Sequence, residues 1–304
     1  MTGRIYKGER GQAAVLTVIA LTVVLGMTAI VLDVGSWFRQ HRQLQTAADA
    51  AALAGAQALP YDTGQANTLA QNYASRNGGD GTNQISFLNS HGPNDTIRVK
   101  ASKTAPGFFA KIFGIDSVNV SASAQARADL PVQALHVAPM VVSEKHPLLA
   151  GAGCPCFKQE TTLNFDPMGA PGAFGMLNLD GQNGTVGTSD EAKWILDGFS
   201  KYLPLGNYRS DPGAKFSSQE VQGALADRIG TVLLFPVFRT LDGTGQQARY
   251  DIIGWVGFYL EGYEIHGNNA VLRGYFTRFI AEGIQSENGS GQPDFGVRSI
   301  QLTD

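Results

Sequence analysis

The sequence of 304 residues has little charge and only 2 cysteines. Lys, Arg, Asp and Glu make up 16% of it, whereas soluble domains average about 25%. The formal net charge of −3 shows no basic excess, so nucleic acid is not expected as a partner. Two cysteines cannot form a disulfide-rich scaffold or a four-cysteine zinc site. The hydrophobic content of 43% excludes a wholly disordered chain.

Motifs that mark common enzyme classes are also missing. The sequence contains no G-x-S-x-G nucleophile elbow, no G-x-x-x-x-G-K-[ST] phosphate loop and no H-E-x-x-H zinc motif. We therefore expect no enzyme activity, no catalytic residue, and no bound cofactor or metal. The alternative is a membrane-tethered extracytoplasmic enzyme, or a ligand- or metal-binding module, with its site in residues 131–304.

Residues 13–32 form a long run without any charged side chain. At about 1.5 Å per helical residue, such a helix is about 30 Å long, which is the hydrocarbon thickness of a bilayer. Threonines are the main polar members of the run, and a threonine hydroxyl can bond back to its own helix. We expect an uncleaved transmembrane helix. The alternatives are a cleaved signal peptide and a buried helix of a soluble core.

The expected orientation of this helix rests on the basic residues that flank it and on the length of chain that follows it. Basic residues precede the run and also follow it, so the positive-inside rule favours a cytoplasmic N-terminus only weakly. Most of the chain comes after the run, however, and contains no second one. We expect a single-pass protein with residues 1–12 in the cytoplasm and its bulk outside. Arg10 and Asp33 would mark the membrane boundaries, with Asp33 solvated or paired to an arginine of a neighbouring subunit.

A helical stalk is expected to continue the transmembrane helix over residues 33–59. This segment has no proline before Pro60, and residues 47–58 include eight alanines, which favour helix. Apolar and small side chains recur every three or four positions and make one face, along which helices can approach closely. We expect this face to pack against copies of itself or related subunits; the alternative is packing against the chain's own globular part. Its members are Trp37, Phe38, Leu44, Ala48, Ala51 and Gly55.

Three blocks of the first 60 residues form a specific pattern: Arg10–Val15, Asp33–Gly35 and Arg42–Ala56, which reads RQLQTAADAAALAGA. In order and spacing they closely resemble the N-terminal segment of TadG-like proteins of Flp (tight adherence) pilus assembly. The resemblance implies a bacterial cell-membrane protein that is a minor-pilin-like structural or accessory component of a Tad/Flp pilus or secretion system. The implied partners are the lipid bilayer and other Tad/Flp pilus-assembly or pilin-like subunits, with self-association through the stalk helix.

The sequence departs from the wider class in two ways. Prepilins carry a glutamate five residues after the glycine of the processing site, but Leu16 lies at that distance from Gly11, and Ala13 from Gly8. This difference argues against prepilin cleavage and ordinary incorporation into a filament. The Asp-x-Ser-x-Ser motif of von Willebrand-type metal sites, found in some larger TadG-like proteins, is absent as well.

Two α+β modules, residues 61–130 and 131–304, are expected after the stalk. In the first, a short helix is expected over Thr63–Arg76, ended by Asn77-Gly78-Gly79. Alternation predicts a half-buried strand over 118–128. Phe108 and Phe109 are expected in the core, the alternative being a partner-binding patch. In the second, helices are expected at 189–202 and from Ser217, the latter with Ile229 on its buried side. A mainly antiparallel sheet is expected from the β-branched and aromatic runs at 231–238, 250–263, 270–279 and 297–302.

Cys154-Pro155-Cys156 is the most distinctive local motif of the second module. Thiols outside the cytoplasm tend to oxidise, and cysteines two positions apart can bridge in a small ring. A disulfide between Cys154 and Cys156 is therefore the leading interpretation. The alternatives are a redox-active pair, a metal site completed by His136 or His146, and free or intermolecular thiols.

Overall fold

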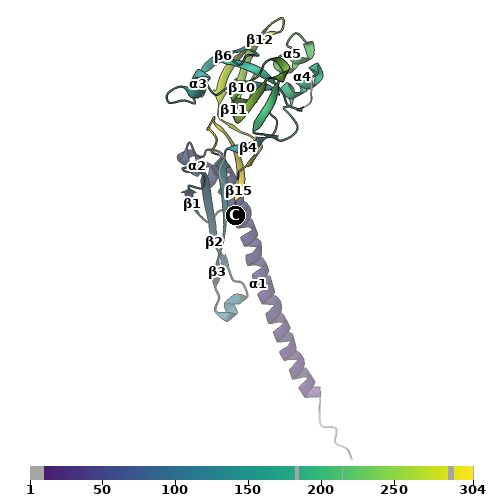
Figure 1. Cartoon of the computed structure of the whole chain (residues 1–304). Coiled ribbons are helices and arrows are strands. Elements are labelled where there is room, and N and C mark those ends of the chain that lie inside the picture. Colours follow the sequence, from purple (N-terminus) through teal and green to yellow (C-terminus); the bar gives the residue numbers. More distant parts are fainter. Residues whose placement is uncertain (1–9, 182–184, 214, 287–290, 304) are drawn as a thin grey trace, which may run out of the picture. The chain divides into compact units, whose positions relative to one another are not determined.

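The computed structural model describes residues 10–181, 185–213, 215–286 and 291–303 (Figure 1). The chain divides into two compact units. Unit 1 comprises Met1–Arg127 and Gln301–Asp304, and unit 2 comprises Ala128–Ile300. The predicted cytoplasmic tail, residues 1–12, lies mostly outside the described residues.

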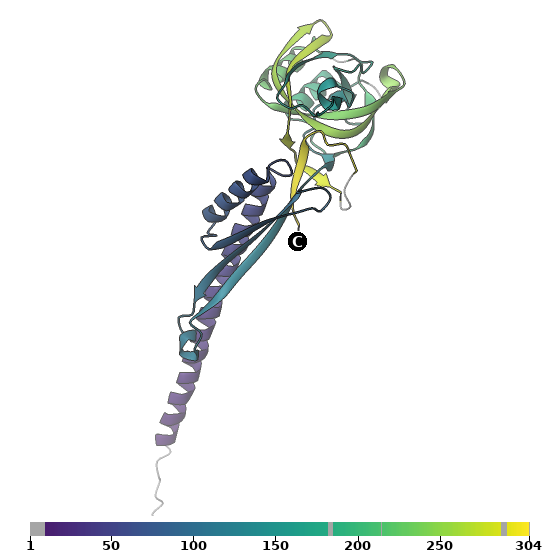
Figure 2. The same ribbon diagram turned by 90° about the vertical axis from the view of Figure 1, so that its left-hand side faces the viewer.

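Two helices of unit 1 follow the predicted bounds closely. α1 (Arg10–Ala56) is one continuous helix of 47 residues, because no proline interrupts it. α2 (Thr63–Arg76) begins where the carboxylate of Asp62 accepts a hydrogen bond from the amide of Gln65 at 2.8 Å. α2 packs beside the C-terminal part of α1 (Figure 2).

In the sheet of unit 1, β1, β2 and β3 lie next to one another in this order. β2 and β3 form a continuous antiparallel hairpin, and η1, a short 3-10 helix, lies in its turn. The strand β3 follows the predicted alternation, with Val120, Ala122, Ala124 and Ala126 buried. The elements are β1 (Thr82–Leu88), β2 (Thr96–Pro106), η1 (Ala110–Phe113) and β3 (Ser117–Asp129). The last strand, β15 (Val297–Thr303), is divided between the units, with residues 297–300 in unit 2.

The helices and the sheet of unit 1 are packed through small side chains. Alanines of α1 and α2 are almost fully buried, and Gly55 lies where the two helices meet β2. A Cβ atom at Gly55 would lie 2.5 Å from Cδ1 of Ile97 and 3.0 Å from the carbonyl oxygen of Ala66. The buried alanines are Ala47, Ala48, Ala51, Ala52, Ala54, Ala56, Ala66, Ala70 and Ala74.

In its described residues, unit 2 contains most of the strands and three α-helices. The helices are α3 (Pro147–Ala150), α4 (Thr188–Leu196) and α5 (Gln219–Asp227), with a 3-10 turn, η2 (Gly245–Gln247). The strands are β4 (Pro131–Ala134), β5 (Met140–Ser143), β6 (Glu160–Phe165), β7 (Ala173–Asn178), β8 (Leu203–Pro204), β9 (Gly206–Ser210), β10 (Val232–Asp242), β11 (Arg249–His266), β12 (Asn269–Thr277), β13 (Phe279–Ile280) and β14 (Gly283–Gln285).

The main sheet of unit 2 closes into a ring. Its order is β10-β5-β7-β6-β12-β11-β9, and β10 also pairs with β11, while β9 also pairs with β7. The pairs are antiparallel except β10–β5 and β6–β7. The fold class is thus α+β with mainly antiparallel sheets, as predicted. Closure of the ring was not predicted, because it depends on pairing between β10 and β5 across about ninety residues of chain.

Aromatic side chains fill the core of unit 2. Phe235 of β10 stacks on Phe258 of β11 with ring centroids 5.1 Å apart, and Phe258 meets the edge of Phe276 at 5.6 Å. α5 adds Val221 and Leu225, which have no exposed surface. These contacts form one continuous apolar core.

α4 and α5 end earlier than predicted. α4 ends at Leu196 because Gly198 adopts φ +75° and lies against the backbone of His136, where a Cβ would come within 2.4 Å. α5 ends at Asp227, so Ile229 lies beyond the helix and is 46% exposed. The prediction of a buried Ile229 is therefore wrong.

Candidate functional site

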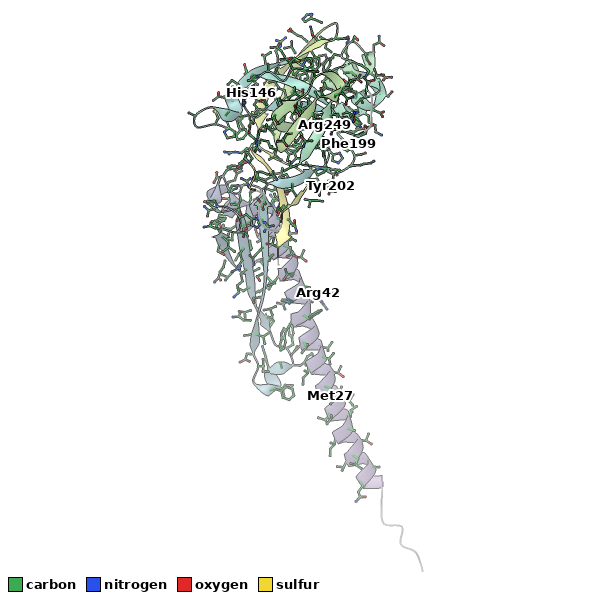
Figure 3. All side chains as sticks on the ribbon, in the orientation of Figure 1. Met27, Arg42, His146, Phe199, Tyr202 and Arg249 are labelled. Atoms are coloured by element: carbon green, nitrogen blue, oxygen red, sulfur yellow. A yellow bond between two sulfur atoms is a disulfide. The ribbon has the colours of Figure 1, made fainter. Side chains whose placement is uncertain are left out.

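The predicted span is an uncovered apolar stretch of α1. Within the described residues, one helix is long and apolar enough to cross a membrane, and its most apolar window is not buried inside the structure. The hydroxyls of Thr17, Thr22 and Thr28 each donate to the carbonyl oxygen four residues earlier, at 2.8 Å. The polar side chains of this stretch are therefore satisfied within the helix, which suits a lipid environment. Figure 3 labels Met27, which is 64% exposed, within this stretch.

Asp33 is the first acidic residue of α1 and is almost fully buried, at 1% exposure. Its carboxylate accepts hydrogen bonds from the amides of Phe108 at 3.2 Å, Phe109 at 2.8 Å and Ala110 at 2.6 Å. These amides begin η1, so Asp33 acts as the cap of a helix that lies 77 residues later in the chain. The prediction of a solvated Asp33 is wrong, because the turn between β2 and β3 covers it.

Polar side chains spaced four residues apart along α1 hold the β2–β3 hairpin. After Asp33, the indole of Trp37 donates to the carbonyl of Pro106 at 3.0 Å. A ring nitrogen of His41 lies 3.0 Å from the carbonyl of Ser121, and the amide of Gln45 donates to the carbonyl of Ser123 at 3.2 Å. Since side chains four positions apart lie on one helix face, this row fixes the position of the hairpin along α1.

The predicted packing face of the stalk divides into a covered and an uncovered part. Leu44, Ala48, Ala51 and Gly55 are buried within unit 1 by α2 and β2, so the chain's own elements already occupy them. Their packing against another subunit stays a prediction.

Phe38 belongs to the same predicted face but remains 60% exposed. The guanidinium of Arg42 lies 5.4 Å from the centroid of its ring, a cation–π contact on the open side of the helix. Figure 3 labels Arg42 on this part of α1. Trp37 is half-buried beneath the hairpin. Phe38 is therefore the predicted face residue that another subunit could still contact.

Phe108 and Phe109 lie at the tip of the hairpin and are 66% and 42% exposed. The prediction of core positions is wrong for both, because the turn projects them away from the sheet. The sequence signal that could have indicated this is the length of the turn: Gly107–Ile115 is rich in large apolar residues but too short to bury them.

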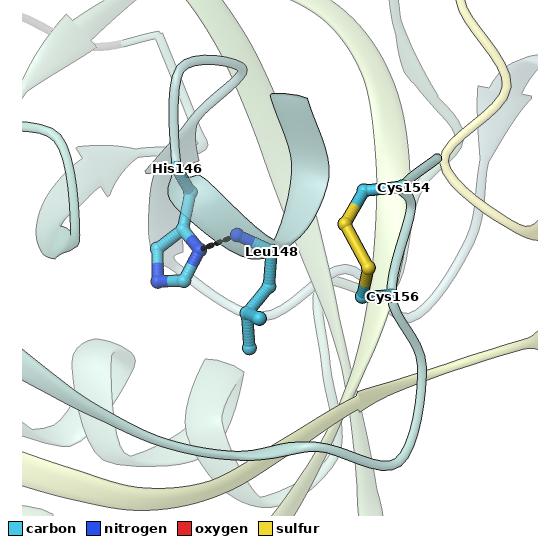
Figure 4. The surroundings of a disulfide bond; sticks show 4 residues. All are labelled: His146, Leu148, Cys154 and Cys156. Carbon is cyan, nitrogen blue, oxygen red and sulfur yellow. Dashed lines mark hydrogen bonds between the residues drawn. A yellow bond between two sulfur atoms is a disulfide. The ribbon is translucent and has the colours of Figure 1, made fainter. Parts of the chain in front are cut away.

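Cys154 and Cys156 are joined by a disulfide in the structure (Figure 4). The neighbouring His146 is 3% exposed, and its Nδ1 accepts a hydrogen bond from the amide of Leu148 at 3.1 Å, at the start of α3. Its ring meets the edge of Phe276 at 4.9 Å, and burial lowers the pKa of His146. His136 is exposed, and its Nδ1 lies 3.0 Å from the carbonyl oxygen of Asp197. Among the described residues, no three His, Cys, Asp or Glu side chains gather as metal ligands would.

A cavity of about 390 Å³ opens on unit 2 beside α4 and β10 and is the place where an enzyme site would be sought. Its arginine, Arg228, donates to the carbonyl oxygens of Leu196 and Val232. Glu282 accepts a hydrogen bond from the Tyr202 hydroxyl at 3.3 Å, and the hydroxyl of Thr231 donates to the carbonyl of Arg228. Each of these polar groups is hydrogen-bonded within the fold.

Two buried carboxylates lie near each other in unit 2. Glu191 of α4 is 1% exposed and Asp211 is 2% exposed. Burial, with the charge of Asp211 adding to it, raises the pKa of Glu191 to about 7, although the amide of Lys215 donates to it. Lys215 also donates to the carbonyl of Val186 and lies 4.0 Å from Asp211. The cluster joins α4 to the following loops and makes local stability sensitive to pH.

Residues 11–58 match the family model described as putative Flp pilus-assembly TadE/G-like. The match confirms the predicted resemblance of the N-terminal segment to TadE/G-like pilus-assembly proteins, and it covers well under half of the chain. The matched residues cover α1 and the buried stalk, not unit 2. No curated protein and no solved structure matches the chain.

Proposed function

We propose that this protein is a non-enzymatic, minor-pilin-like structural or accessory component of a Tad/Flp pilus-assembly or secretion system. Residues 13–32 anchor it in the bacterial cell membrane with the N-terminus in the cytoplasm. The remaining chain is extracytoplasmic and acts through its surfaces. The observation that carries the proposal is the coincidence of the TadE/G-like match with a helix whose apolar stretch is uncovered.

The exposed part of the stalk is the proposed contact with other subunits. Val34 and Phe38 are 51% and 60% exposed and lie one helical turn apart, just beyond the apolar run. A second pilin-like helix, or a second copy of this chain, would bury both side chains. The buried alanines nearer the C-terminal end of α1 support this contact indirectly. They pack against α2 and β2, so these elements do not cover the side of α1 that exposes Val34 and Phe38.

The alternative function is a tethered enzyme or ligand-binding module in unit 2. Its best support is the cavity of about 390 Å³, but the arginine there is bound to backbone carbonyls. The disulfide between the two cysteines also removes the soft sulfur ligands that a metal site there would need.

Release of the protein from the membrane tests the proposed role. Replacing residues 1–32 with a cleavable leader would export residues 33–304 without the anchor and leave the buried stalk intact. We expect loss of the integral membrane form and loss of pilus assembly in a strain that depends on this chain. A matched control replaces residues 13–32 with an unrelated apolar segment of equal length and should keep the membrane fraction. Normal pili from the released form would overturn the proposal.

A further inference from the structure

The tip of the β2–β3 hairpin carries five large apolar side chains that face away from the core. They are exposed by 66%, 42%, 81%, 61% and 44% in Phe108, Phe109, Ile112, Phe113 and Ile115, respectively. Scattered exposed apolar residues are ordinary, but a contiguous group in one short turn marks a contact surface.

This tip lies beside the membrane-spanning part of α1. Phe109, Ile112 and Phe113 share an apolar groove of about 530 Å³ with the stretch of α1 between Thr22 and Leu32. That stretch belongs to the uncharged run, and it is about 15 Å long along the helix, about half of the hydrocarbon thickness. Figure 1 shows the turn after β2 next to α1. If residues 13–32 lie in lipid, the tip occupies the same layer.

The hairpin is held at this depth by α1 itself. The carboxylate of Asp33 accepts three amide hydrogen bonds from the start of η1, and Trp37 donates to the carbonyl of Pro106. Sliding the tip along the helix would break these bonds together. The depth of the tip is therefore coupled to the depth of the anchor.

The backbone amides of the tip are hydrogen-bonded within the protein, as an apolar environment requires. Besides the three amides held by Asp33, the amide of Gly107 donates to the carbonyl of Asp116 at 2.9 Å, and that of Ile112 to Phe109 at 3.0 Å. The amides of Gly114 and Ile115 donate to Lys111 and Ala110. Internal pairing of these donors avoids the cost of several kcal/mol that each unpaired group would meet in lipid.

The charges of the hairpin are placed as a membrane contact requires. Lys111 is the single charged residue between Lys103 and Asp116, and it is exposed. Its long aliphatic stem allows the ammonium to reach the headgroup layer while neighbouring rings stay in the acyl chains. Above the tip, Lys103 pairs with Asp80 at 3.0 Å, in the part of the hairpin that would remain in water.

We propose that residues 107–115 form a second membrane contact, in which the apolar tip inserts into the phospholipid leaflet that surrounds the C-terminal half of the span. The inference rests on the proposed anchoring by residues 13–32 and deepens it. A single helix does not fix the tilt and rotation of the stalk at the membrane, whereas two contacts do. The exposed face around Phe38 would then be presented in a defined direction.

The test uses tryptophan as a depth probe in the full chain, reconstituted in vesicles of phosphatidylethanolamine and phosphatidylglycerol. Phe113→Trp adds a probe at the tip, Val24→Trp adds one in the span, and Ile229→Trp adds one on the exposed surface of unit 2. The wild-type tryptophan fluorescence is subtracted from that of each variant. The remaining fluorescence is compared in normal vesicles, in vesicles with brominated acyl chains, and with aqueous iodide.

We expect the added emission of Phe113→Trp to be quenched by brominated lipid at least twofold more than that of Ile229→Trp, and to resist iodide. Quenching by iodide but not by brominated lipid would overturn the inference. The inference would also be overturned if the added emission resisted both quenchers and chemical crosslinking of the same vesicles gave a dimer, because a second copy would then cover the tip. If Val24→Trp also escapes brominated lipid, the anchoring itself fails; if only Phe113→Trp escapes, the anchor stands and the second contact fails.

Discussion

The carboxylate of Asp33 accepts a hydrogen bond of 2.6 Å from the amide of Ala110, which joins the end of the apolar run to the tip of a hairpin 77 residues later. This contact explains why a lone acidic residue follows the long uncharged stretch. A buried carboxylate needs several donors, and three backbone amides supply them. The contact also gives the stalk and the hairpin one common position along α1.

Removal of the Asp33 carboxylate should loosen the hairpin tip. In Asp33→Ala the three amides lose their acceptor, and the local free energy of opening should fall by about 1–3 kcal/mol. Hydrogen exchange at Phe108, Phe109 and Ala110 in detergent-solubilised full chain measures this directly. Asp116→Ala is the matched control, because Asp116 is exposed and contributes its backbone carbonyl to the turn. Equal protection in both variants would contradict the capping role.

A methyl group at Gly55 should destabilise unit 1. Its Cβ would meet the Ala66 carbonyl oxygen at 3.0 Å and Ile97 at 2.5 Å, so Gly55→Ala should cost about 1–3 kcal/mol of unfolding free energy. Gly35→Ala lies on the same helix with nothing within 4 Å, and it should be neutral or up to about 1 kcal/mol more stable. Thermal unfolding of the two variants compares them, and a stable Gly55→Ala would refute the close packing of α1, α2 and β2.

Glu191 should make the stability of unit 2 depend on pH. Its folded-state pKa of about 7 lies above the ordinary value near 4.5, so the folded chain binds this proton more tightly than the unfolded chain. The free energy of unfolding should therefore fall as pH rises from about 4.5 to about 7, by about 3 kcal/mol in total, and the loss should persist above that range.

Substitution of Glu191 separates this effect from other titrations. Glu191→Gln should be more stable than wild type at pH 7.5 and should lose the pH dependence between 5 and 7 in urea unfolding. Asp190→Asn, an exposed neighbour on α4, should keep the wild-type dependence. Parallel pH profiles for wild type and Glu191→Gln would show that the buried carboxylate does not titrate in this range.

The two cysteines should react with maleimide only after reduction. The chain is purified from membranes, denatured without reductant and treated with maleimide, and mass spectrometry counts the adducts. We expect none before reduction and two after it, because both sulfur atoms are bonded to each other. Cys156→Ser frees its partner and should give one adduct without reductant. Two adducts on the unreduced wild type would favour free thiols or a metal site.

The bounds of helices could be predicted from the sequence better than the contacts between segments that lie far apart in the chain. Thr63–Arg76 was predicted to its ends because local helix signals decide it, and the long helix because alanine and the lack of proline decide it. The role of Asp33 could not be predicted, since its donors lie 75 to 77 residues away and are backbone groups without a sequence signature. Phe108 and Phe109 were assigned to the core because hydrophobicity does not distinguish burial in protein from contact with lipid.

The proposed function requires the exposed side of the stalk to contact other pilus-assembly subunits in the membrane. A photo-crosslinking amino acid in place of Phe38, in cells that assemble pili, tests it most directly, with the same residue in place of the buried Leu44 as control. We expect the Phe38 position to crosslink to a Tad/Flp pilus-assembly protein, a pilin-like subunit or a second copy, whereas the Leu44 position should yield only internal products. Absence of any intermolecular protein product from Phe38, in membranes where the variant still supports pili, would contradict it.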